Sequence, residues 1–388
     1  SVDALTIVDD TEDADLIDGA PLYTNGNVVA NVTSPPPLAL VTHKNRLWVV
    51  DATNPLSISY SKLLSPGIPV EFGLNFNVNV SPKGGPVTAI ASMDDKLIIF
   101  KRNSIYMVTG DGPAADGSGD DLSAATFITS DCGCLNQRSV GTVPDGLMFQ
   151  SDKGIKLLTR SLASENIGAQ VQDLTVANCT STVQIADRNQ IRLTFDDRTC
   201  LMFDYYVGQW SQFTNIDAVD SIVWNQKHVY LRSSGMVLEE SSTSYTDDGS
   251  FIQRKIKTAW LSFAGLQGYQ RIYRILLLGR YESAHKLFVD VAYDFNPVPV
   301  QTLEIEPTAA TTYGSTSPYG GDAVYGGTFA PYQWRVNVAR QKCQSIQLTI
   351  RDTQNGSDPG ASSTLSGMTV LVGIIGQTNR MPSTQSVG

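Results

Sequence analysis

The residue types that carry acid–base, metal or nucleophilic chemistry are few and widely spread in this sequence. None of the three histidines, His43, His228 and His285, has a cysteine or second histidine at metal-ligand spacing. No Gly-x-Ser-x-Gly elbow, phosphate-binding loop or dinucleotide fingerprint occurs. The stretch Ser151–Gly154 approaches the Ser-x-Asp-x-Gly boxes of glycosidase propellers but lacks their aromatic end. We therefore predict no catalytic residue, no cofactor and no enzyme activity, although folding could still bring together a carboxylate pair for glycoside hydrolysis.

A second candidate for chemistry is the glycine- and aspartate-rich stretch from Gly110 to Asp121. Several carboxylates lie close together there, which is the chemistry that calcium requires, but their spacing fits no EF-hand or Asp-rich repeat. We interpret the stretch as an exposed connecting loop and predict no metal site.

The five cysteines are an odd number and show no pairing pattern. Cys132 and Cys134 are separated by one residue, which is too close for an easy mutual disulfide, and no second pair completes a zinc site. We expect free, partly buried thiols, which are typical of a protein that folds in a reducing compartment.

The elements that must position these residues are repeated. An apolar strand, a tight polar turn, a second apolar strand and a third strand return five times before residue 246. A unit of three or four strands recurring every 40–50 residues is typical of a β-propeller blade. The five copies are Pro37–Tyr60, Pro86–Val108, Arg138–Leu158, Thr180–Phe203 and Val219–Leu238, with first turns centred on Asn45, Asp95, Asp145, Asp187 and Asn225.

The pattern changes near residue 246. Seven longer alternating stretches follow, which predict an antiparallel β-sandwich-like domain. We thus expect an all-β chain with three parts: residues 1–36 as an N-terminal extension or partial blade, 37–245 as a β-propeller, and 246–388 as the sandwich. The predicted strands of the sandwich are Lys255–Phe263, Ile272–Arg280, Lys286–Phe295, Gln301–Ile305, Gln333–Ala339, Ser345–Asp352 and Met368–Ile375.

Within the second domain, residues 307–332 form a long stretch of Gly, Ser, Thr, Ala and Pro that carries four tyrosines. Tyrosine among small residues is the chemistry of adaptable contact surfaces, and a loop this long is usually functional or disordered. We expect this loop to contact a partner or line a channel through Tyr313, Tyr319, Tyr325 and Tyr332.

Composition narrows the class of protein further. The net charge is −10, and the first 20 residues contain no basic residue, unlike a signal peptide. No run of 18 apolar residues occurs, so we predict no membrane span. An acidic surface argues against sequence-reading of nucleic acid but suits a protein that DNA must slide past.

Several stretches resemble the tail nozzle proteins of short-tailed bacteriophages, also called tail tubular protein B or packaged-DNA stabilisation proteins. The resemblance covers roughly residues 35–300 and consists of structural residues, so it carries over no catalytic residue. Family members carry further sequence before the Pro-rich lead-in at 34–37, so the resemblance leads us to expect either that this chain is a fragment or that one or more blades come from elsewhere. The stretches are GGPVTAIASMDDKLIIFKRNSIYMVTGDGP (84–113), HKNRLWVV (43–50), PDGLMFQSDKGIKLLTR (144–160), FDYYVGQWSQFTN (203–215) and TAWLSFAGLQGYQRIYRILLLG (258–279).

The resemblance implies a structural protein of the phage tail. We expect a homo-oligomer, a hexameric ring that assembles in the host bacterial cytoplasm, sits below the head–tail adaptor in the virion and contacts the adaptor and the tail fibre or spike proteins. Such a ring retains packaged double-stranded DNA and conducts it during ejection without reading its sequence. The alternatives are a secreted β-propeller that binds or hydrolyses glycans and an intracellular propeller scaffold.

Overall fold

A computed structural model describes residues 28–119, 122–265, 268–281, 285–305, 331–353 and 362–378. The chain divides into two compact units, Ser1–Glu240 and Ser241–Gly388. Within the described residues, each unit is all-β apart from three short 3-10 helices in the first: η1 (Gln137–Ser139), η2 (Ala169–Leu174) and η3 (Ala186–Arg188). None of the described helices is long and apolar enough to cross a membrane.

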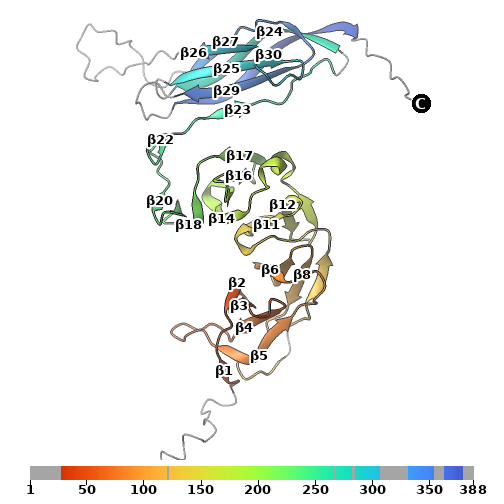
Figure 1. Cartoon of the computed structure of the whole chain (residues 1–388), viewed down its shortest axis with the longest axis vertical. Helices are drawn as coiled ribbons and strands as arrows, with labels where there is room; N and C mark the ends of the chain where they lie inside the picture. Colours follow the sequence, from red (N-terminus) through yellow and green to blue (C-terminus); the bar gives the residue numbers. More distant parts are fainter. Residues whose placement is uncertain are drawn as a thin grey trace, which may run out of the picture. The chain divides into compact units, whose positions relative to one another are not determined.

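The first unit is a series of five small antiparallel sheets that follow one another along the chain (Figure 1). Apart from β1, which pairs with β5, strands that are consecutive in the chain pair with one another in each sheet, as in the blades of a β-propeller. The first sheet has the order β1-β5-β4-β3-β2, and the others run in chain order. The first two sheets contain β1 (Asn31–Val32), β2 (Pro37–His43), β3 (Arg46–Asp51), β4 (Ser57–Ser61) and β5 (Phe72–Asn79), then β6 (Val87–Met93), β7 (Lys96–Lys101), β8 (Ile105–Thr109) and β9 (Thr126–Thr129). The third and fourth contain β10 (Gly141–Val143), β11 (Gly146–Ser151), β12 (Gly154–Thr159) and β13 (Ser164–Asn166), then β14 (Cys179–Ile185), β15 (Gln190–Phe195), β16 (Cys200–Asp204) and β17 (Gln209–Phe213). The fifth contains β18 (Ala218–Trp224), β19 (Lys227–Arg232) and β20 (Val237–Glu239).

The tight turn of each repeat joins β2 to β3, β6 to β7, β10 to β11, β14 to β15 and β18 to β19; below, the first strand of each sheet means β2, β6, β10, β14 or β18. In the first sheet Lys44 and Asn45 both have positive φ (46° and 56°), and in the fifth Asn225 and Gln226 do as well (50° and 62°). Two successive left-handed residues make the hairpin turn that matches the twist of antiparallel strands, and Asn tolerates this conformation best. The repeat seen in the sequence is therefore a repeat of hairpins at equivalent positions.

A second shared feature is an irregularity at the start of the first strand. The register between the first two strands shifts at the second residue in four sheets, at Leu38, Thr88, Thr180 and Val219. At two of these sites the displaced threonine hydroxyl bonds to the next part of the chain: Thr88 Oγ1 donates at 2.7 Å to the carbonyl of Cys134, in the segment that leads to the third sheet, and Thr180 Oγ1 donates at 2.7 Å to the carbonyl of Ala218 in the fifth sheet.

Hydrophobic clusters join the first four sheets in sequence. The first lies between sheets one and two and contains Trp48, Tyr60 and Ile90, the second joins sheets two and three, and the third joins sheets three and four. The first strands of successive sheets also lie side by side, β2 against β6, β10 against β14, and β14 against β18. This face-to-face packing with adjacent first strands is a β-propeller arrangement.

The second unit is an antiparallel sandwich. One sheet has the order β23-β29-β25-β26, and in the other β24 pairs with β27 and β28 on one side and β30 on the other. Their facing side chains form one core that includes Ile275, Val289 and Leu348. The strands are β21 (Thr246–Asp247) and β22 (Ser250–Phe251), which form a separate hairpin, and then β23 (Lys255–Lys257), β24 (Gly268–Tyr281), β25 (Lys286–Tyr293), β26 (Gln301–Ile305), β27 (Pro331–Val336), β28 (Lys342–Cys343), β29 (Ile346–Thr353) and β30 (Ser363–Thr378).

Several boundaries expected from the sequence are wrong; the predicted strand Met368–Ile375, for example, is only the middle of β30. The predicted strand Lys255–Phe263 pairs with β29 only over Lys255–Lys257 and returns to it through a single bridge between Leu261 and Ile346. The predicted loop 307–332 extends two residues too far at its C-terminal end, because Pro331 and Tyr332 already pair with β24.

Candidate interaction surfaces

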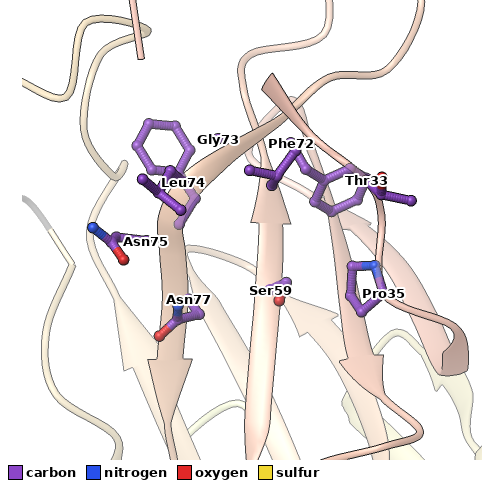
Figure 2. Close-up of a pocket in the computed structure, with 10 residues that line it drawn as sticks. Thr33, Pro35, Ser59, Phe72, Gly73, Leu74, Asn75 and Asn77 are labelled. Atoms are coloured by element: carbon purple, nitrogen blue, oxygen red, sulfur yellow. The ribbon is translucent and has the colours of Figure 1, made fainter. Parts of the chain in front are cut away.

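A shallow groove lies at the outer part of the first sheet (Figure 2). It encloses roughly 240 Å³ between β5, β4 and the segment that leads into β2. The polar side-chain groups at its wall are the hydroxyls of Thr33 and Ser59 and the amides of Asn75 and Asn77, and Leu74 adds an exposed apolar side chain. Because no lining side chain ionises near neutral pH, this groove can offer hydrogen bonds and apolar contact rather than acid–base chemistry. Its lining residues are Val32, Thr33, Pro35, Ser59, Phe72, Gly73, Leu74, Asn75, Phe76 and Asn77.

The groove belongs to the face of the first sheet that does not pack on the second sheet. Ser59 lies between Ile58 and Tyr60, which are both in the first hydrophobic cluster, so strand alternation turns Ser59 to the opposite face. Ser59 is paired with Asn77 in β5 and with Val49 in β3, and Val49 with Leu40 in β2.

The same face presents exposed leucines at its first strand. Ala39 and Val41 of β2 pack into the cluster with the second sheet, whereas Leu38 and Leu40 alternate with them and are 52% and 54% exposed. In the second sheet, by contrast, both faces of the corresponding strand β6 are covered: Ile90 packs in the cluster with the first sheet, and Ala89 and Ala91 pack in the cluster with the third. The first sheet thus packs one apolar face on the second sheet and exposes Leu38 and Leu40 on its other face, where Val49 is nevertheless buried.

The fifth sheet has a matching open face at the other end of the series. Ile222 and Trp224 of β18 are 59% and 69% exposed, and they lie on one face with Leu231 of β19 and Val237 of β20. The opposite face packs on the fourth sheet through β18 and β14. Exposed apolar patches of this kind on a folded unit usually mark contact surfaces for other polypeptide.

One buried cation and one partly buried cation hold the loop beside the first sheet. Arg46 is 1% exposed and donates to the carbonyls of Asp111 (3.0 Å), Ser61 (2.9 Å) and Pro113. Lys44 adds an ion pair to Asp111 at 2.6 Å. The start of the glycine- and aspartate-rich loop is therefore fixed to the first sheet by its backbone carbonyls. Among the described residues no group of three or more His, Cys, Asp or Glu side chains is placed to hold a metal ion.

An ionic cluster joins the fourth and fifth sheets. Arg192 of β15 donates to Glu240 Oε2 at 2.9 Å and contacts His228 Nδ1 at 3.2 Å, and Arg188 pairs with Glu240 Oε1 at 2.7 Å. Burial, and then the charge of Arg192, lower the pKa of His228 to about 4, so this histidine is neutral near pH 7. Burial alone would raise the pKa of Glu240, but hydrogen bonds from Arg192 and Arg188 outweigh it and lower that pKa.

The other histidines also sit in structural settings. His43 Nδ1 lies 2.8 Å from Ser92 Oγ of the second sheet, and burial lowers its pKa. His285 is 1% exposed and its ring stacks on Phe251. The three histidines are therefore not brought together.

The cysteines are free and all five are buried. Cys132 and Cys134 lie in the cluster between the second and third sheets, and burial raises the pKa of Cys134 to about 12. These thiols are deeper than the partly buried ones that we expected from the sequence.

The structure describes one of the four tyrosines named from the sequence. Tyr313, Tyr319 and Tyr325 lie outside the described residues. Tyr332 belongs to β27, where it pairs with Gly279 of β24.

Sequence reasoning did not find the open faces of the first and fifth sheets. The sequence does show that β2 carries apolar residues at consecutive positions. That pattern does not reveal which face of the strand a neighbouring sheet covers.

Comparison with known proteins gives no family assignment. No family model matches the sequence, and no curated protein matches it. Among solved structures, BamB from Moraxella catarrhalis aligns at 12% identity and a TM-score of 0.30 over 51% of this chain and 67% of its own. The N-terminal domain of Nup159 aligns at 12% identity and a TM-score of 0.30, over 63% of this chain and 72% of its own. A glycoside hydrolase family 43 arabinoxylan arabinofuranohydrolase from Bacillus subtilis aligns at 9% identity and a TM-score of 0.20, over 86% of this chain and 78% of its own. At these TM-scores the likenesses carry no argument about function, and the description of the fold rests on the sheet order and register above.

Proposed function

We propose that this protein is a structural subunit of a phage tail nozzle, a ring below the head–tail adaptor that retains packaged DNA and conducts it during ejection. The observation that carries the proposal is the pair of open apolar faces at the two ends of the five-sheet series. The first sheet exposes Leu38 and Leu40, and the fifth exposes Ile222 and Trp224. Faces of this type need further polypeptide to cover them, which suits a subunit of an assembly.

The reason for proposing this particular assembly is the resemblance of the stretches between residues 43 and 279 to nozzle proteins. Two different faces on one chain form head-to-tail contacts, and such contacts close into a ring when the rotation between copies allows it. Six copies would carry a formal charge of roughly −60, which favours a channel past which the DNA phosphates slide without binding.

The assembly is tested by imaging the protein alone and on the intact particle. We expect six-fold symmetry in the particle, and a single copy per virion would contradict the proposal. A Trp224→Asp change should lower ring formation at least tenfold at a fixed protein concentration. The matched control is Tyr206→Asp, because Tyr206 is 82% exposed in the turn between β16 and β17 and lies outside this face.

The role in DNA passage is tested separately on the isolated ring. Filter binding with duplex DNA at low and moderate salt should show weak retention with little dependence on salt. Tight retention that falls steeply with salt would mean a basic channel and would contradict the DNA part of the proposal. Retention of soluble glycans by a monomeric form would instead favour the glycan-binding alternative.

A further inference from the structure

One sheet of the second unit is basic although the chain is acidic. This sheet consists of β24, β27, β28 and β30 (Figure 1). Its strands contain four arginines, one lysine and no aspartate or glutamate, whereas the chain as a whole has a net charge of −10. The sheet is therefore opposite in sign to the rest of the protein.

These cations lie on the side of the sheet that faces away from the sandwich core. Arg335 lies between Trp334 and Val336 in β27, and both of these pack into the core. Strand alternation therefore turns Arg335 outward. Arg274 faces the same side, because it pairs with Leu371 of β30, which is exposed between two residues that pack on the core. All five cations are exposed, and we call the surface that they form the basic face: Arg271, Arg274, Arg280, Arg335 and Lys342.

Apolar and aromatic side chains lie among these cations. Leu278 and Leu371 are 41% and 55% exposed, and Tyr273 is 49% exposed. The Tyr273 ring covers Gly373, where a Cβ atom would lie 2.7 Å from it, and the Arg271 guanidinium lies 5.6 Å from the centre of the ring. Arginine and tyrosine are enriched where proteins meet. A phosphate backbone offers no apolar surface to cover the leucines, so the basic face suits an acidic polypeptide better than a nucleic acid.

The basic face and the first unit have complementary charges. The first unit, Ser1–Glu240, contains 28 acidic and 16 basic residues, whereas Ser241–Gly388 contain 10 acidic and 12 basic residues. The acidic excess of the chain thus lies in the first unit. Two copies of the basic face would repel each other, because like charges would meet across the contact. A contact between copies therefore has to join this face to a different, acidic surface.

We propose that the basic face binds the acidic first unit of a second copy. A contact between two different surfaces is head-to-tail, so each copy uses its basic face toward one neighbour and its first unit toward another. The contact deepens the proposed function by adding an interface to those of the first and fifth sheets. It rests on that function only in that copies associate, and it requires neither DNA nor a virion.

The first test is sedimentation of the complete chain over a range of concentrations at low and moderate salt. Arg274→Glu with Arg335→Glu should weaken association about tenfold or more, because cations that meet carboxylates are reversed. In the unchanged protein, association through this face should weaken as salt rises. Association that is equally strong in the variant and the unchanged protein would overturn the proposal.

The matched control makes the same change of charge elsewhere in the second unit. Lys255→Glu with Lys257→Glu reverses two exposed residues of β23, which belongs to the other sheet. We expect association to stay within about twofold of the unchanged protein, because exposed charges away from a contact contribute little. Equal weakening in both pairs would show a general effect of net charge and overturn the proposal.

A cross-link tests the contact without reversing a charge. Lys342 and an Arg274→Lys change place amines on the basic face, and a carbodiimide joins such amines to carboxylates in contact with them. Mixing isotope-labelled with unlabelled copies separates links between copies from links within one copy. We expect links between copies from these amines to carboxylates of residues 1–240. Links confined to one copy, links to the second unit alone, or no links would overturn the proposal.

Duplex DNA and vesicles of anionic lipid are the competing partners of a basic surface. Retention of either by the unchanged protein that is lost in Arg274→Glu with Arg335→Glu, without a change in self-association, would overturn the proposal. A six-fold ring that forms equally well with the reversed face would overturn this contact alone and leave the proposed function standing. Cross-links between copies without six-fold symmetry in the particle would support this contact and contradict the proposed function.

Discussion

Arg192 Nη1 and Glu240 Oε2 lie 2.9 Å apart and join the fourth sheet to the last residue of the first unit. Arg192 is 11% exposed at its side chain and Glu240 32%, so solvent screens the pair only in part. The contact fixes the point at which the chain leaves the five sheets. It also places a permanent positive charge beside His228, and this has a consequence for the dependence of stability on pH.

We predict that His228 makes the protein less stable as the pH falls. Its pKa is about 4 when folded and 6.5 as the ordinary value, so between these values the unfolded chain binds a proton that the folded chain does not. The free energy of unfolding should therefore fall as the pH drops below 6.5, by at most about 1.4 kcal/mol per pH unit from this group. Denaturant unfolding at pH 7.5, 6.5 and 5.5 should show a shallower fall in His228→Gln than in the unchanged protein. An identical fall in both would contradict the prediction.

Lys101 should be required for stability although it is a charged residue. It is fully buried, and its ammonium donates to the carbonyls of Gly85 (2.7 Å), Lys83 (3.3 Å) and Ser81. Lys101→Met leaves these carbonyls without their donor, and we expect a loss of about 2–4 kcal/mol in chemical denaturation. Lys153→Met is the control, because Lys153 is an exposed partner of Asp131 and should change stability by about 0.5 kcal/mol or less. Comparable losses in both variants would argue against the role of Lys101.

Gly133 should tolerate no side chain. A Cβ atom there would lie 1.9 Å from the Lys101 carbonyl oxygen, which also accepts a hydrogen bond from Cys134 N–H at 2.9 Å. We expect Gly133→Ala to lower the free energy of unfolding by about 3 kcal/mol or more, because the backbone of one of the two segments must move. Ser130→Ala, at an exposed position nearby, should change it by about 0.5 kcal/mol or less. A melting temperature for Gly133→Ala equal to that of Ser130→Ala would show that the segments separate easily.

The thiols should be unreactive until the protein unfolds. All five are buried, and burial raises the pKa of Cys179 to about 11 and that of Cys134 to about 12. The thiolate is the reactive form, so at pH 8 the reaction with a thiol reagent should be roughly 100-fold or more slower than that of free cysteine. Five thiols should react in guanidinium. Fast reaction of even one thiol in the native protein would contradict the burial described above.

The tyrosine-rich loop should serve assembly rather than folding. The core of the second unit is formed by strands on both sides of this loop, so we expect deletion of residues 311–330 to leave its thermal unfolding within about 5 °C of the unchanged protein. Assembly or infectivity should fall. Replacement of Tyr313, Tyr319 and Tyr325 by alanine should reproduce the loss, and replacement by phenylalanine should retain most of the contact. Unfolding of the second unit on deletion would make the loop structural.

Local information was sufficient to predict the repeats. Alternation of apolar residues and the turns at Asn45 and Asn225 act over a few residues, because hairpin geometry depends on neighbours along the chain. The all-β class, the five blade-like units and the change to a sandwich could be predicted for this reason. Strand ends were less certain, as at Lys257, because the partner strand β29 decides where pairing stops.

Only the tertiary structure decided which surfaces are open. Leu40 and Val41 have similar side chains, yet Val41 packs against the second sheet and Leu40 is exposed, since a neighbouring sheet covers one face alone. The buried ions follow the same logic. Nothing local to Arg46 or Lys101 distinguishes it from a surface cation, because the carbonyls that accept its hydrogen bonds come from loops many residues away. Glu240 meets Arg192 across 48 residues of sequence, and folding alone brings them together.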